Sequence, residues 1–366
     1  MKVVIINVCA GCYSTGRICS QIAQSYIDSG NQCMIVYGQN SKEERLPTIS
    51  FNNKFDIYKH VLKTRLFDNT GFESKKSTKN LLSYLDKFKP DLIWLHNIHG
   101  YYINVEMLFG WIKEHPEVEI KWTLHDCWAF TGHCSYFTAV GCDKWKYGCE
   151  KCIQKNAYPQ SYIMDHSKEN YYRKKKAFTG VNNMTIITPS QWLADLVKQS
   201  FLKEYKVEVH YNTVDKQVFK KRVSDFRTKF KLEKFKIVLG VACPWSQRKG
   251  LNDFIQLSKK LPPNYKIVLV GLNKKQIKSL PNNIIGLNKT DSAIELAEIY
   301  STADVFVNPT YEDNYPTTNL EAKACGTPVI TYNTGGSPES VLPQNVVEVG
   351  NIDGLIKRIY SVCENM

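Results

Sequence analysis

The sequence predicts an α/β protein built from two doubly wound parallel sheets. The chain has 366 residues, enough for two domains at roughly 150 residues each. Apolar runs bounded by turn residues alternate with helical patterns, and this alternation starts a second time at Lys236. Hydrophobic residues (43%) and charged residues (23%) are close to globular averages. This composition excludes a disordered chain and a polytopic membrane protein.

The first half contains five apolar runs that we expect to be strands and at least two helical patterns between them. The expected strands are Lys2–Val8, Gln32–Tyr37, Leu92–His96, Ile120–Leu124 and Thr185–Thr188. The expected helices are Arg17–Ser29 and Lys79–Phe88.

The second half repeats the pattern. It begins with the strand KIVLGVA at Lys236 and continues with a helix over Gly250–Lys260, the strand KIVLVG, a helix over Ala293–Ser301, the strand DVFVNP and a terminal helix over Asp353–Cys363. We therefore expect domains at residues 1–210 and 211–366, joined in the basic stretch before Lys236. The cleft between two such halves is the expected ligand site.

The charge balance favours an anionic partner. Lys and Arg (48) outnumber Asp and Glu (35), which gives a net charge of +13. Nucleotide phosphates, nucleic acid and a lipid surface all fit this sign. The charge is spread over both halves rather than gathered in a tail, so we expect no nucleic-acid partner. No apolar run reaches the ~18 residues of a membrane span, and the N-terminal run is too short for a secretory signal. We expect a cytoplasmic protein.

The first turn between strand and helix, AGCYSTGR, runs from Ala10 to Arg17. Gly16 would let backbone amides approach a ligand phosphate, and Arg17 adds a positive charge. A plain tight turn is the alternative, because the GxGxxG spacing is absent.

The segment NPTYEDNYPTTNLEAKACGTPVI, residues 308–330, carries a stronger signal. A strand ends at its start, an acidic loop follows, and a helix begins near Thr317 with backbone amides available for an anion. Asp313 in the loop and Glu321 in the helix could together hold a ligand that bears a diol. Acidic residues that merely favour a helix N-terminus explain Asp313 alone.

Four cysteines gather in a loop at residues 133–152: Cys134, Cys142, Cys149 and Cys152. Four thiols in a short loop of a reduced protein favour a structural zinc site, with His133 as a substitute ligand. Free thiols packed under a loop are the alternative, because the spacing between the pairs is irregular for a zinc ribbon.

Basic residues such as Lys59, Lys63 and Arg65 are interleaved with Tyr58, Leu62, Leu66 and Phe67. This arrangement fits a helix that lies on an anionic membrane surface. A solvated helix face is the alternative.

The acidic segment resembles the signature of the retaining GT-B glycosyltransferases of family four, in the branch that reads EDN-x-P before the helix. Other segments agree in order, so the resemblance spans nearly the full chain: HNIHGYYIN (96–104), WTLHDCWAFTGHC (122–134), TPSQWLADLVKQSFL (188–202), YNTVDKQVF (211–219), WSQRKG (245–250) and TGGSPE (334–339). The chain is similar to the colanic-acid and capsular-polysaccharide transferases of bacteria. The resemblance implies the GT-B fold, with two Rossmann-like domains facing across a cleft.

The resemblance also assigns roles in the donor half. It implies that Glu321 holds the nucleotide ribose and that Asp313, or its neighbour Glu312, faces the donor sugar. Thr317 and Thr318 match the helix-start positions that bind diphosphate. The glycines usual in this loop are replaced by Asn314, Tyr315 and Pro316, so the sugar contacts differ from the family pattern, and Pro316 has no amide to donate.

Lys249 matches the family lysine that neutralises the diphosphate. The usual arginine five positions earlier is Pro244 here, and Arg248 could supply that charge. In the first half, His125 matches the histidine directed at the transferred sugar. His96 and His99 are expected to line the same site.

The expected activity is that of a retaining, hexosyltransferase-type glycosyltransferase. A UDP- or GDP-sugar would bind the second domain, and a glycan acceptor, in particular a lipid-linked one, would bind the first. No catalytic metal is expected. The protein would work in bacterial surface-polysaccharide synthesis, in the cytoplasm or at the cytoplasmic face of the inner membrane. The alternatives are a GT-B sugar-nucleotide epimerase and a non-catalytic protein that binds nucleotide sugars or polyanions.

Overall fold

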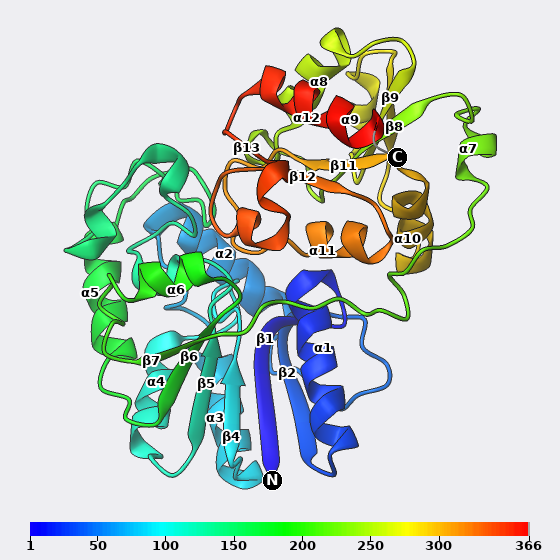
Figure 1. Ribbon diagram of the computed structural model, residues 1–366. Helices are drawn as coiled ribbons and strands as arrows, with labels where there is room; N and C mark the ends of the chain where they lie inside the picture. Colours follow the sequence, from blue (N-terminus) through cyan, green and yellow to red (C-terminus); the bar gives the residue numbers. More distant parts are fainter. Residues whose placement is uncertain (365–366) are drawn as a thin grey trace. The chain divides into compact units, whose positions relative to one another are not determined.

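The computed structural model describes residues 1–364 and divides the chain into two compact units, Met1–Tyr211 and the part from Asn212 onward. Each unit is a parallel sheet with helices on both faces (Figure 1). The structure therefore confirms the α/β class with two doubly wound sheets. No helix among residues 1–364 is long and apolar enough to cross a membrane.

The N-terminal sheet has seven parallel strands in the order β3-β2-β1-β4-β5-β6-β7. Their bounds are β1 (Lys2–Ala10), β2 (Gln32–Ser41), β3 (Thr48–Ile49), β4 (Leu92–Leu95), β5 (Glu119–Thr123), β6 (Met184–Thr188) and β7 (Lys206–Val209). Successive side chains of β1 point to opposite faces. Val3 and Ile5 pack in one hydrophobic cluster, while Val4 and Ile6 pack in another.

Helix α1 (Tyr13–Asp28) covers the face of Val3 and Ile5. The opposite face packs against α3 (Lys75–Phe88) and α4 (Val105–Glu114), through residues such as Leu81 and Leu108. The remaining helices are α2 (Lys54–Phe67), α5 (Ser167–Phe178) and α6 (Gln191–Val197).

The C-terminal sheet has six parallel strands in the order β10-β9-β8-β11-β12-β13. Their bounds are β8 (Lys236–Val241), β9 (Tyr265–Val270), β10 (Ile284–Leu287), β11 (Val305–Asn308), β12 (Val329–Tyr332) and β13 (Val346–Val347). Leu257 of α8 (Leu251–Lys260) and Ile359 of α12 (Ile352–Glu364) pack on one face. The other face packs against α7 (Phe226–Lys229), α10 (Ala293–Thr302) and α11 (Thr317–Ala324), and α9 (Lys274–Lys278) follows β9.

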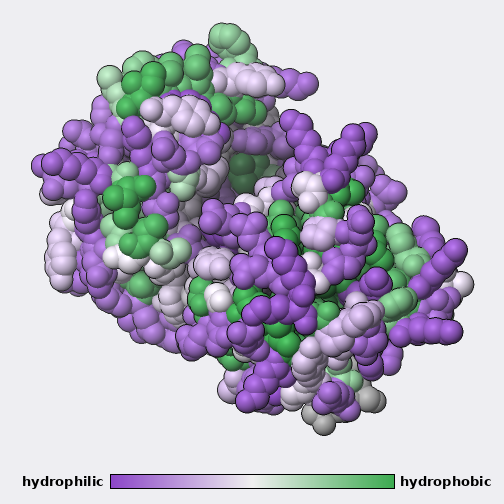
Figure 2. Space-filling model, turned by 90° about the horizontal axis from the view of Figure 1, so that it is seen from above, coloured by the Kyte–Doolittle hydropathy of each residue, from purple (hydrophilic) through white to green (hydrophobic). Residues whose placement is uncertain are grey.

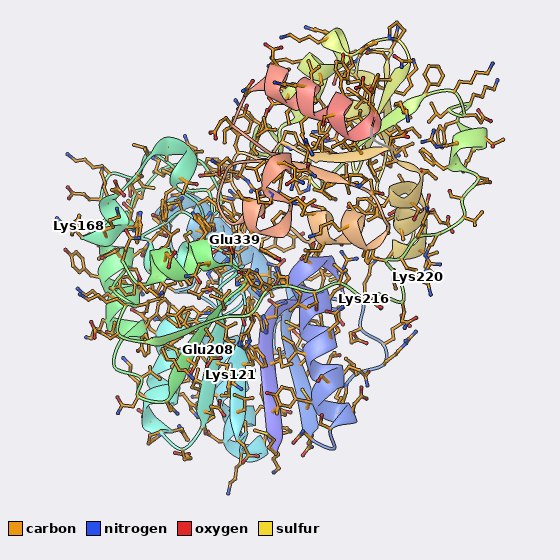
Figure 3. The ribbon with its side chains drawn as sticks, in the orientation of Figure 1. Lys121, Lys168, Glu208, Lys216, Lys220 and Glu339 are labelled. Atoms are coloured by element: carbon orange, nitrogen blue, oxygen red, sulfur yellow. The ribbon has the colours of Figure 1, made fainter. Side chains whose placement is uncertain are left out.

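The surface carries charge over both units. Lys121 and Lys168 lie in the N-terminal unit, and Lys216 and Lys220 lie near the start of the C-terminal unit (Figure 3). Hydrophilic side chains also dominate the face shown in Figure 2, with separate hydrophobic patches between them. The basic charge is therefore distributed along the chain, as the sequence predicts.

The expected strands and helices are confirmed, with shifts of a few residues at most of their ends. The main difference concerns α1, which begins at Tyr13 rather than at Arg17. The turn after β1 is therefore only Gly11–Cys12. Gly11 has a φ of 65°, and a Cβ there would lie 2.7 Å from the Glu43 nitrogen. Glycine is required at this turn.

Candidate functional site

The loops that follow β8 and β11 meet at the point where the strand order of the C-terminal sheet reverses. The chain runs from β8 outward through β9 to β10, then returns to β11 on the other side of β8. Ligands of open α/β sheets bind at the carboxyl ends of the strands at such a switch point. The loop after β8 carries Arg248 and Lys249, and the loop after β11 carries Glu312 and Asp313. The fold thus brings two cations and two carboxylates together.

Gly250 permits the close approach of these two loops. Its φ is 74°, and a Cβ at this position would lie 2.2 Å from the carbonyl oxygen of Pro309. No other residue type avoids both the left-handed conformation penalty and this collision. The backbone amide of Tyr311 donates to the Arg248 carbonyl at 2.8 Å, which joins the loops just beyond the glycine.

Arg248 and Lys249 hold different parts of the acidic loop. The Lys249 ammonium lies 2.5 Å from Oδ2 of Asp313, and both side chains are less than one quarter exposed. The Arg248 guanidinium donates to the backbone carbonyl of Glu312 at 2.6 Å. Lys249 therefore neutralises a carboxylate, whereas Arg248 holds the backbone of the loop.

A glycine pair from TGGSPE supports the acidic loop from its other side. Gly336 donates its amide to the Asp313 carbonyl at 3.3 Å. At Gly335, whose φ is 57°, a Cβ would collide with that same carbonyl oxygen. The Thr334 hydroxyl donates to the Tyr311 carbonyl at 2.9 Å, and Asn212 donates to the Tyr315 carbonyl at 3.2 Å. The loop position is thus fixed mainly through its backbone.

Helix α11 begins at Thr317, as predicted, directly after Pro316. Its first turn places Thr317 and Thr318 where helix-start amides and the helix dipole favour an anion. One turn further on, Glu321 is only 4% exposed. The hydroxyl of Tyr300, from α10, donates to its Oε2 at 3.2 Å, so this carboxylate is oriented from inside the unit.

Asn319, which was not expected as a site residue, anchors α11 to the strands. Its amide group donates to the hydroxyls of Ser337 and Ser340 at 3.3 and 2.8 Å and accepts from Asn308 at 2.9 Å. All four residues are buried. Buried polar groups joined in this way fix a unique local arrangement. Because the partners lie far apart in the sequence, no local spacing reveals the network.

Asp253 accepts the hydrogen bonds of a second buried network, which we did not predict from the sequence. It accepts from the hydroxyls of Tyr332 and Tyr311 at 2.8 and 3.2 Å. Burial raises the pKa of Asp253, against the opposing effect of these two hydrogen bonds. Tyr311 therefore connects the start of the acidic loop to α8.

In the N-terminal unit, His96 and His125 meet at the carboxyl ends of β4 and β5. Nδ1 of His96 lies 3.0 Å from Nε2 of His125, with the rings stacked. Burial lowers the pKa of His125 to about 4 and the pKa of His96 well below its usual value. Both rings are therefore neutral near pH 7, and one donates its proton to the other.

His99 and Asp126 form a neighbouring pair, with Nε2 of His99 3.0 Å from Oδ2 of Asp126. Burial opposes ionisation of Asp126, but the charge and hydrogen bond of His99 hold the pKa of Asp126 below its usual value. The Lys174 ammonium donates to the carbonyls of Trp128 and Thr131 at 2.8 and 3.0 Å. Burial lowers the pKa of Lys174 to about 7. The segment after His125 is thus held by the hydrogen bonds of a buried lysine, which was not expected from the sequence.

Gly16 and Arg17 lie inside the first turns of α1, not in the turn before it. Gly16 is buried, and a Cβ there would lie 3.0 Å from the sulfur of Cys9. Arg17 is exposed. The expectation that both lie in the turn was wrong, because the helix starts four residues earlier.

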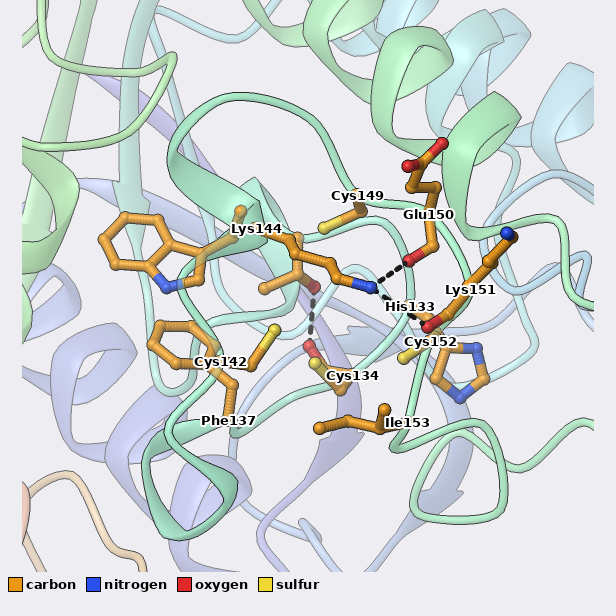
Figure 4. A pocket seen from close by; sticks show the side chains of 12 residues that line it. His133, Cys134, Phe137, Cys142, Lys144, Cys149, Glu150, Lys151, Cys152 and Ile153 are labelled. Atoms are coloured by element: carbon orange, nitrogen blue, oxygen red, sulfur yellow. Dashed lines mark hydrogen bonds between the residues drawn. The ribbon is translucent and has the colours of Figure 1, made fainter.

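The four clustered cysteines line one small cavity of about 20 Å³, together with His133 (Figure 4). A hydrogen bond from Cys134 lowers the pKa of Cys152 to about 7. Nδ1 of His133 lies 2.5 Å from Oδ1 of Asp68. Within residues 1–364, no group of three or more His, Cys, Asp or Glu side chains is arranged to hold a metal ion. The geometry thus gives no support to the zinc site, which stays a prediction.

Comparison with known families bears on the C-terminal unit. Residues 224–366, which contain the whole sheet and the acidic loop, match the family model described as "Glycosyl transferases group 1". This part of the chain is therefore similar to the group 1 glycosyltransferase domain. The donor-site residues expected in the second half, from Arg248 to Glu321, lie inside the matched segment, whereas Gly16 and Arg17 lie outside it.

Curated glycosyltransferases are similar to part of this chain. One is "Putative colanic acid biosynthesis glycosyl transferase WcaC" of Escherichia coli, 29% identical over 174 residues, or 43% of this chain and 41% of the relative. Another is "Processive diacylglycerol alpha-glucosyltransferase" of Acholeplasma laidlawii, 29% identical over 172 residues, or 44% of this chain and 51% of the relative. The alignments thus span about half, or less, of these relatives.

Solved GT-B structures share the fold of both units. Anabaena Alr3699/HepE in complex with UDP has a TM-score of 0.67 at 16% identity, covering 100% of this chain and 90% of that one. Sucrose-phosphate synthase from Thermosynechococcus elongatus has a TM-score of 0.67 at 14% identity, with 98% and 90% covered. Each unit therefore has the fold expected of a GT-B protein.

Proposed function

We propose that the protein is a retaining, hexosyltransferase-type glycosyltransferase. It moves a sugar from a UDP- or GDP-sugar to a lipid-linked glycan during bacterial surface-polysaccharide synthesis, at the cytoplasmic face of the inner membrane. One observation carries the proposal. Four features meet at the switch point of the C-terminal sheet: Arg248, Lys249, the acidic loop and the start of α11. This sheet lies within the residues that match the group 1 family model.

The donor diphosphate is bound by Lys249, Arg248 and the first turn of α11. Cations and helix-start amides that are fixed before the reaction stabilise the charge that develops on a departing diphosphate. In this scheme the protein's own cations carry out that role, so a catalytic metal is not required. The carboxylate that faces the donor sugar is Asp313, with its buried neighbour Glu312 as the alternative.

The nucleoside is held by Glu321, whose buried carboxylate is oriented by Tyr300. A carboxylate can accept hydrogen bonds from both hydroxyls of a ribose. Asn314 and Tyr315 line the sugar and decide which hexose fits. These two positions replace glycines of the related pattern, so the sugar contacts are particular to this chain.

The N-terminal unit binds the acceptor. His125, kept neutral by burial, is directed at the transferred sugar, where a neutral imidazole can hydrogen bond a hydroxyl. Arg17, which is exposed on the first turns of α1, adds a positive charge that suits the phosphates. His96 holds the ring of His125 in place through their shared hydrogen bond.

The relatives support these assignments. The Anabaena protein has been crystallised with UDP and with UDP-glucose, which favours UDP as the nucleotide. The names of relatives include colanic acid biosynthesis, O-antigen chain mannosyltransferase and diacylglycerol glucosyltransferase. These names favour a glycan or glycolipid acceptor.

A thermal-shift panel with UDP, GDP, ADP and their sugar conjugates tests the donor site. A ligand that binds only the folded state stabilises it by about 2.7 kcal/mol at one hundred times its Kd. We expect one nucleotide to raise the melting temperature and Glu321→Ala to abolish the shift. Glu233→Ala, an exposed carboxylate of the same unit, should leave it intact. No shift with any nucleotide would count against the proposal.

The reaction is tested with the nucleotide found in this way. Transfer from its sugar conjugate to a lipid-linked acceptor should give a product with the anomeric configuration of the donor, as read by NMR. An inverted product would overturn the retaining mechanism, and hydrolysis or isomerisation without acceptor would favour the epimerase alternative.

A further inference from the structure

Helix α2 exposes three large apolar side chains and buries two polar ones. Phe55, Tyr58 and Leu62 are 76%, 73% and 58% exposed, whereas the buried residues of the helix are His60 and Thr64. At 3.6 residues per turn, the three apolar residues lie on one face and the two polar ones on the opposite face. A helix that packs against the core of its own domain shows the opposite arrangement, with its apolar residues buried.

The interior side of α2 is satisfied by hydrogen bonds rather than by apolar packing. His60 bonds the Ser74 hydroxyl through Nδ1 at 2.8 Å and accepts from the Gly71 amide at 3.2 Å. Asp56 accepts from the Ser77 hydroxyl at 3.0 Å. No residue of α2 belongs to a hydrophobic cluster of the described structure. The exposed apolar face of α2 therefore packs against no hydrophobic cluster among the described residues.

A neighbouring loop extends the same apolar surface. Tyr162, Ile163 and Met164 are 60%, 63% and 41% exposed. The amides of Tyr162 and Met164 donate to the carbonyls of Arg65 and Leu66 at 2.7 and 3.1 Å, which ties the loop to the end of α2. We define the α2 patch as these six residues: Phe55, Tyr58, Leu62, Tyr162, Ile163 and Met164.

Basic side chains flank the α2 patch. Lys54 and Arg65 lie on one side of the helical stripe and Lys59 on the other, by the 100° step of an α-helix. The guanidinium of Arg65 also lies 5.4 Å from the centre of the Tyr162 ring. Nearby carboxylates are engaged: Glu73 pairs with Lys63 at 3.0 Å. The rim of the patch is therefore positively charged.

We propose that the α2 patch binds the surface of an anionic lipid bilayer, with α2 lying in the plane of the membrane. An apolar stripe between rows of Lys and Arg is the pattern of an interfacial helix, whose apolar face enters the lipid while its cations reach anionic headgroups. An exposed apolar patch that is rimmed by polar residues is typical of an interaction site. Two copies joined through it would bring their basic rims together, which opposes self-association.

Vesicle sedimentation tests the proposal with the full chain. We expect binding to vesicles that contain about one third phosphatidylglycerol and much weaker binding to pure phosphatidylcholine. The double variant Phe55→Ser/Leu62→Ser should lose binding at least tenfold. Lys54→Gln/Lys59→Gln should weaken it by about fivefold for each lysine, since each is worth about one kcal/mol at an anionic surface.

The control is Val223→Ser, which removes a side chain that is 98% exposed in the C-terminal unit and should bind like the parent protein. Equal binding of the parent and of Phe55→Ser/Leu62→Ser would overturn the proposal. So would a dimer in sedimentation velocity that the double variant dissociates, without vesicle binding. Because the patch is exposed, melting temperatures and nucleotide-induced shifts should not change. A failure to bind vesicles would therefore not contradict the proposed donor site. Likewise, a failure to bind nucleotides would not contradict membrane binding by the α2 patch.

Discussion

Lys249 and Asp313 form an ion pair, with Nζ 2.5 Å from Oδ2, between the loops that follow β8 and β11. Neither side chain is fully buried, so the pair is open to exchange with a ligand. An incoming diphosphate must compete with Asp313 for the ammonium. The two partners should therefore respond in opposite ways to removal.

Asp313→Asn should keep or tighten binding of the free nucleoside diphosphate, because it releases the Lys249 ammonium. Lys249→Met should weaken the same binding by about ten- to a hundredfold, since a hydrogen bond to a charged group contributes about 1.5–3 kcal/mol. Both variants should lower transfer. Isothermal titration with the nucleotide separates them, and an equal loss of affinity in both variants would contradict the exchange.

Tyr300→Phe should destabilise the protein by roughly 1 kcal/mol, because it removes the hydrogen bond that the buried Glu321 carboxylate accepts. Nucleotide-induced stabilisation should fall in parallel. Urea unfolding with and without nucleotide measures both effects. Tyr360→Phe, the same change in α12, is the control and should alter neither. If Tyr300→Phe behaved like this control, Glu321 would not depend on Tyr300.

Gly250→Ala should destabilise the C-terminal unit by more than its backbone conformation alone requires. The new Cβ would meet the Pro309 carbonyl at 2.2 Å. Gly180→Ala is the matched control, because Gly180 has a φ of 77° but nothing within 4 Å. It should cost only the roughly 1–2 kcal/mol of a left-handed residue. Similar losses in urea unfolding would show that the loop moves aside.

Stability should fall as the pH drops from about 6.5 towards 4. Burial lowers the pKa of His60 to about 3 and the pKa of His125 to about 4, and His96 shifts the same way. In this range the unfolded chain takes up protons that the folded protein excludes, so the free energy of unfolding decreases with acid. Urea titrations at pH 7, 6 and 5 measure the slope.

His60→Gln should reduce the dependence of the free energy of unfolding on pH. The reduction should be at most the contribution of one proton, about 1.4 kcal/mol per pH unit. His210→Gln, at an exposed position, should leave it unchanged. A slope that His60→Gln does not alter would mean that His60 titrates normally in the folded state.

Cys152 should react with iodoacetamide faster than the other cysteines of its loop, with a midpoint near pH 7. The hydrogen bond from Cys134 that lowers the pKa of Cys152 keeps a reactive thiolate. Cys134→Ser preserves a donor and should retain much of this reactivity, whereas Cys134→Ala should not. Mass spectrometry of alkylated peptides gives the readout. If the protein instead bound one equivalent of zinc and all four thiols resisted alkylation, this result would support the predicted zinc site.

The sequence predicts the two sheets well because each βα unit carries its own periodic pattern. Helix α4 was not expected, although the Asn104 side chain caps it by accepting from the Met107 amide. An Asn before apolar residues at helical spacing was the available signal. The sequence left two alternatives for α2, a helix on a membrane surface and a solvated helix, because a pattern of residues alone does not identify an external partner.

The candidate site, too, could be predicted from the sequence only in part. The acidic loop and the Arg248–Lys249 pair are contiguous in sequence, so their chemistry was visible. Contacts such as Gly335 against Asp313, or His96 with His125, join residues that only the sheet topology brings together. Their existence follows from strand order, which no local spacing encodes.

The acidic loop is held in place by main-chain contacts at Gly250, Gly335 and Gly336 and by carbonyls that accept from Arg248 and Asn212. None of these contacts reads the identity of a loop side chain. These backbone contacts would therefore persist if the side chains at positions 314 and 315 changed. Under the proposed function, a loop held by its main chain would let the choice of sugar change through substitutions at a few positions, without rebuilding the contacts around them.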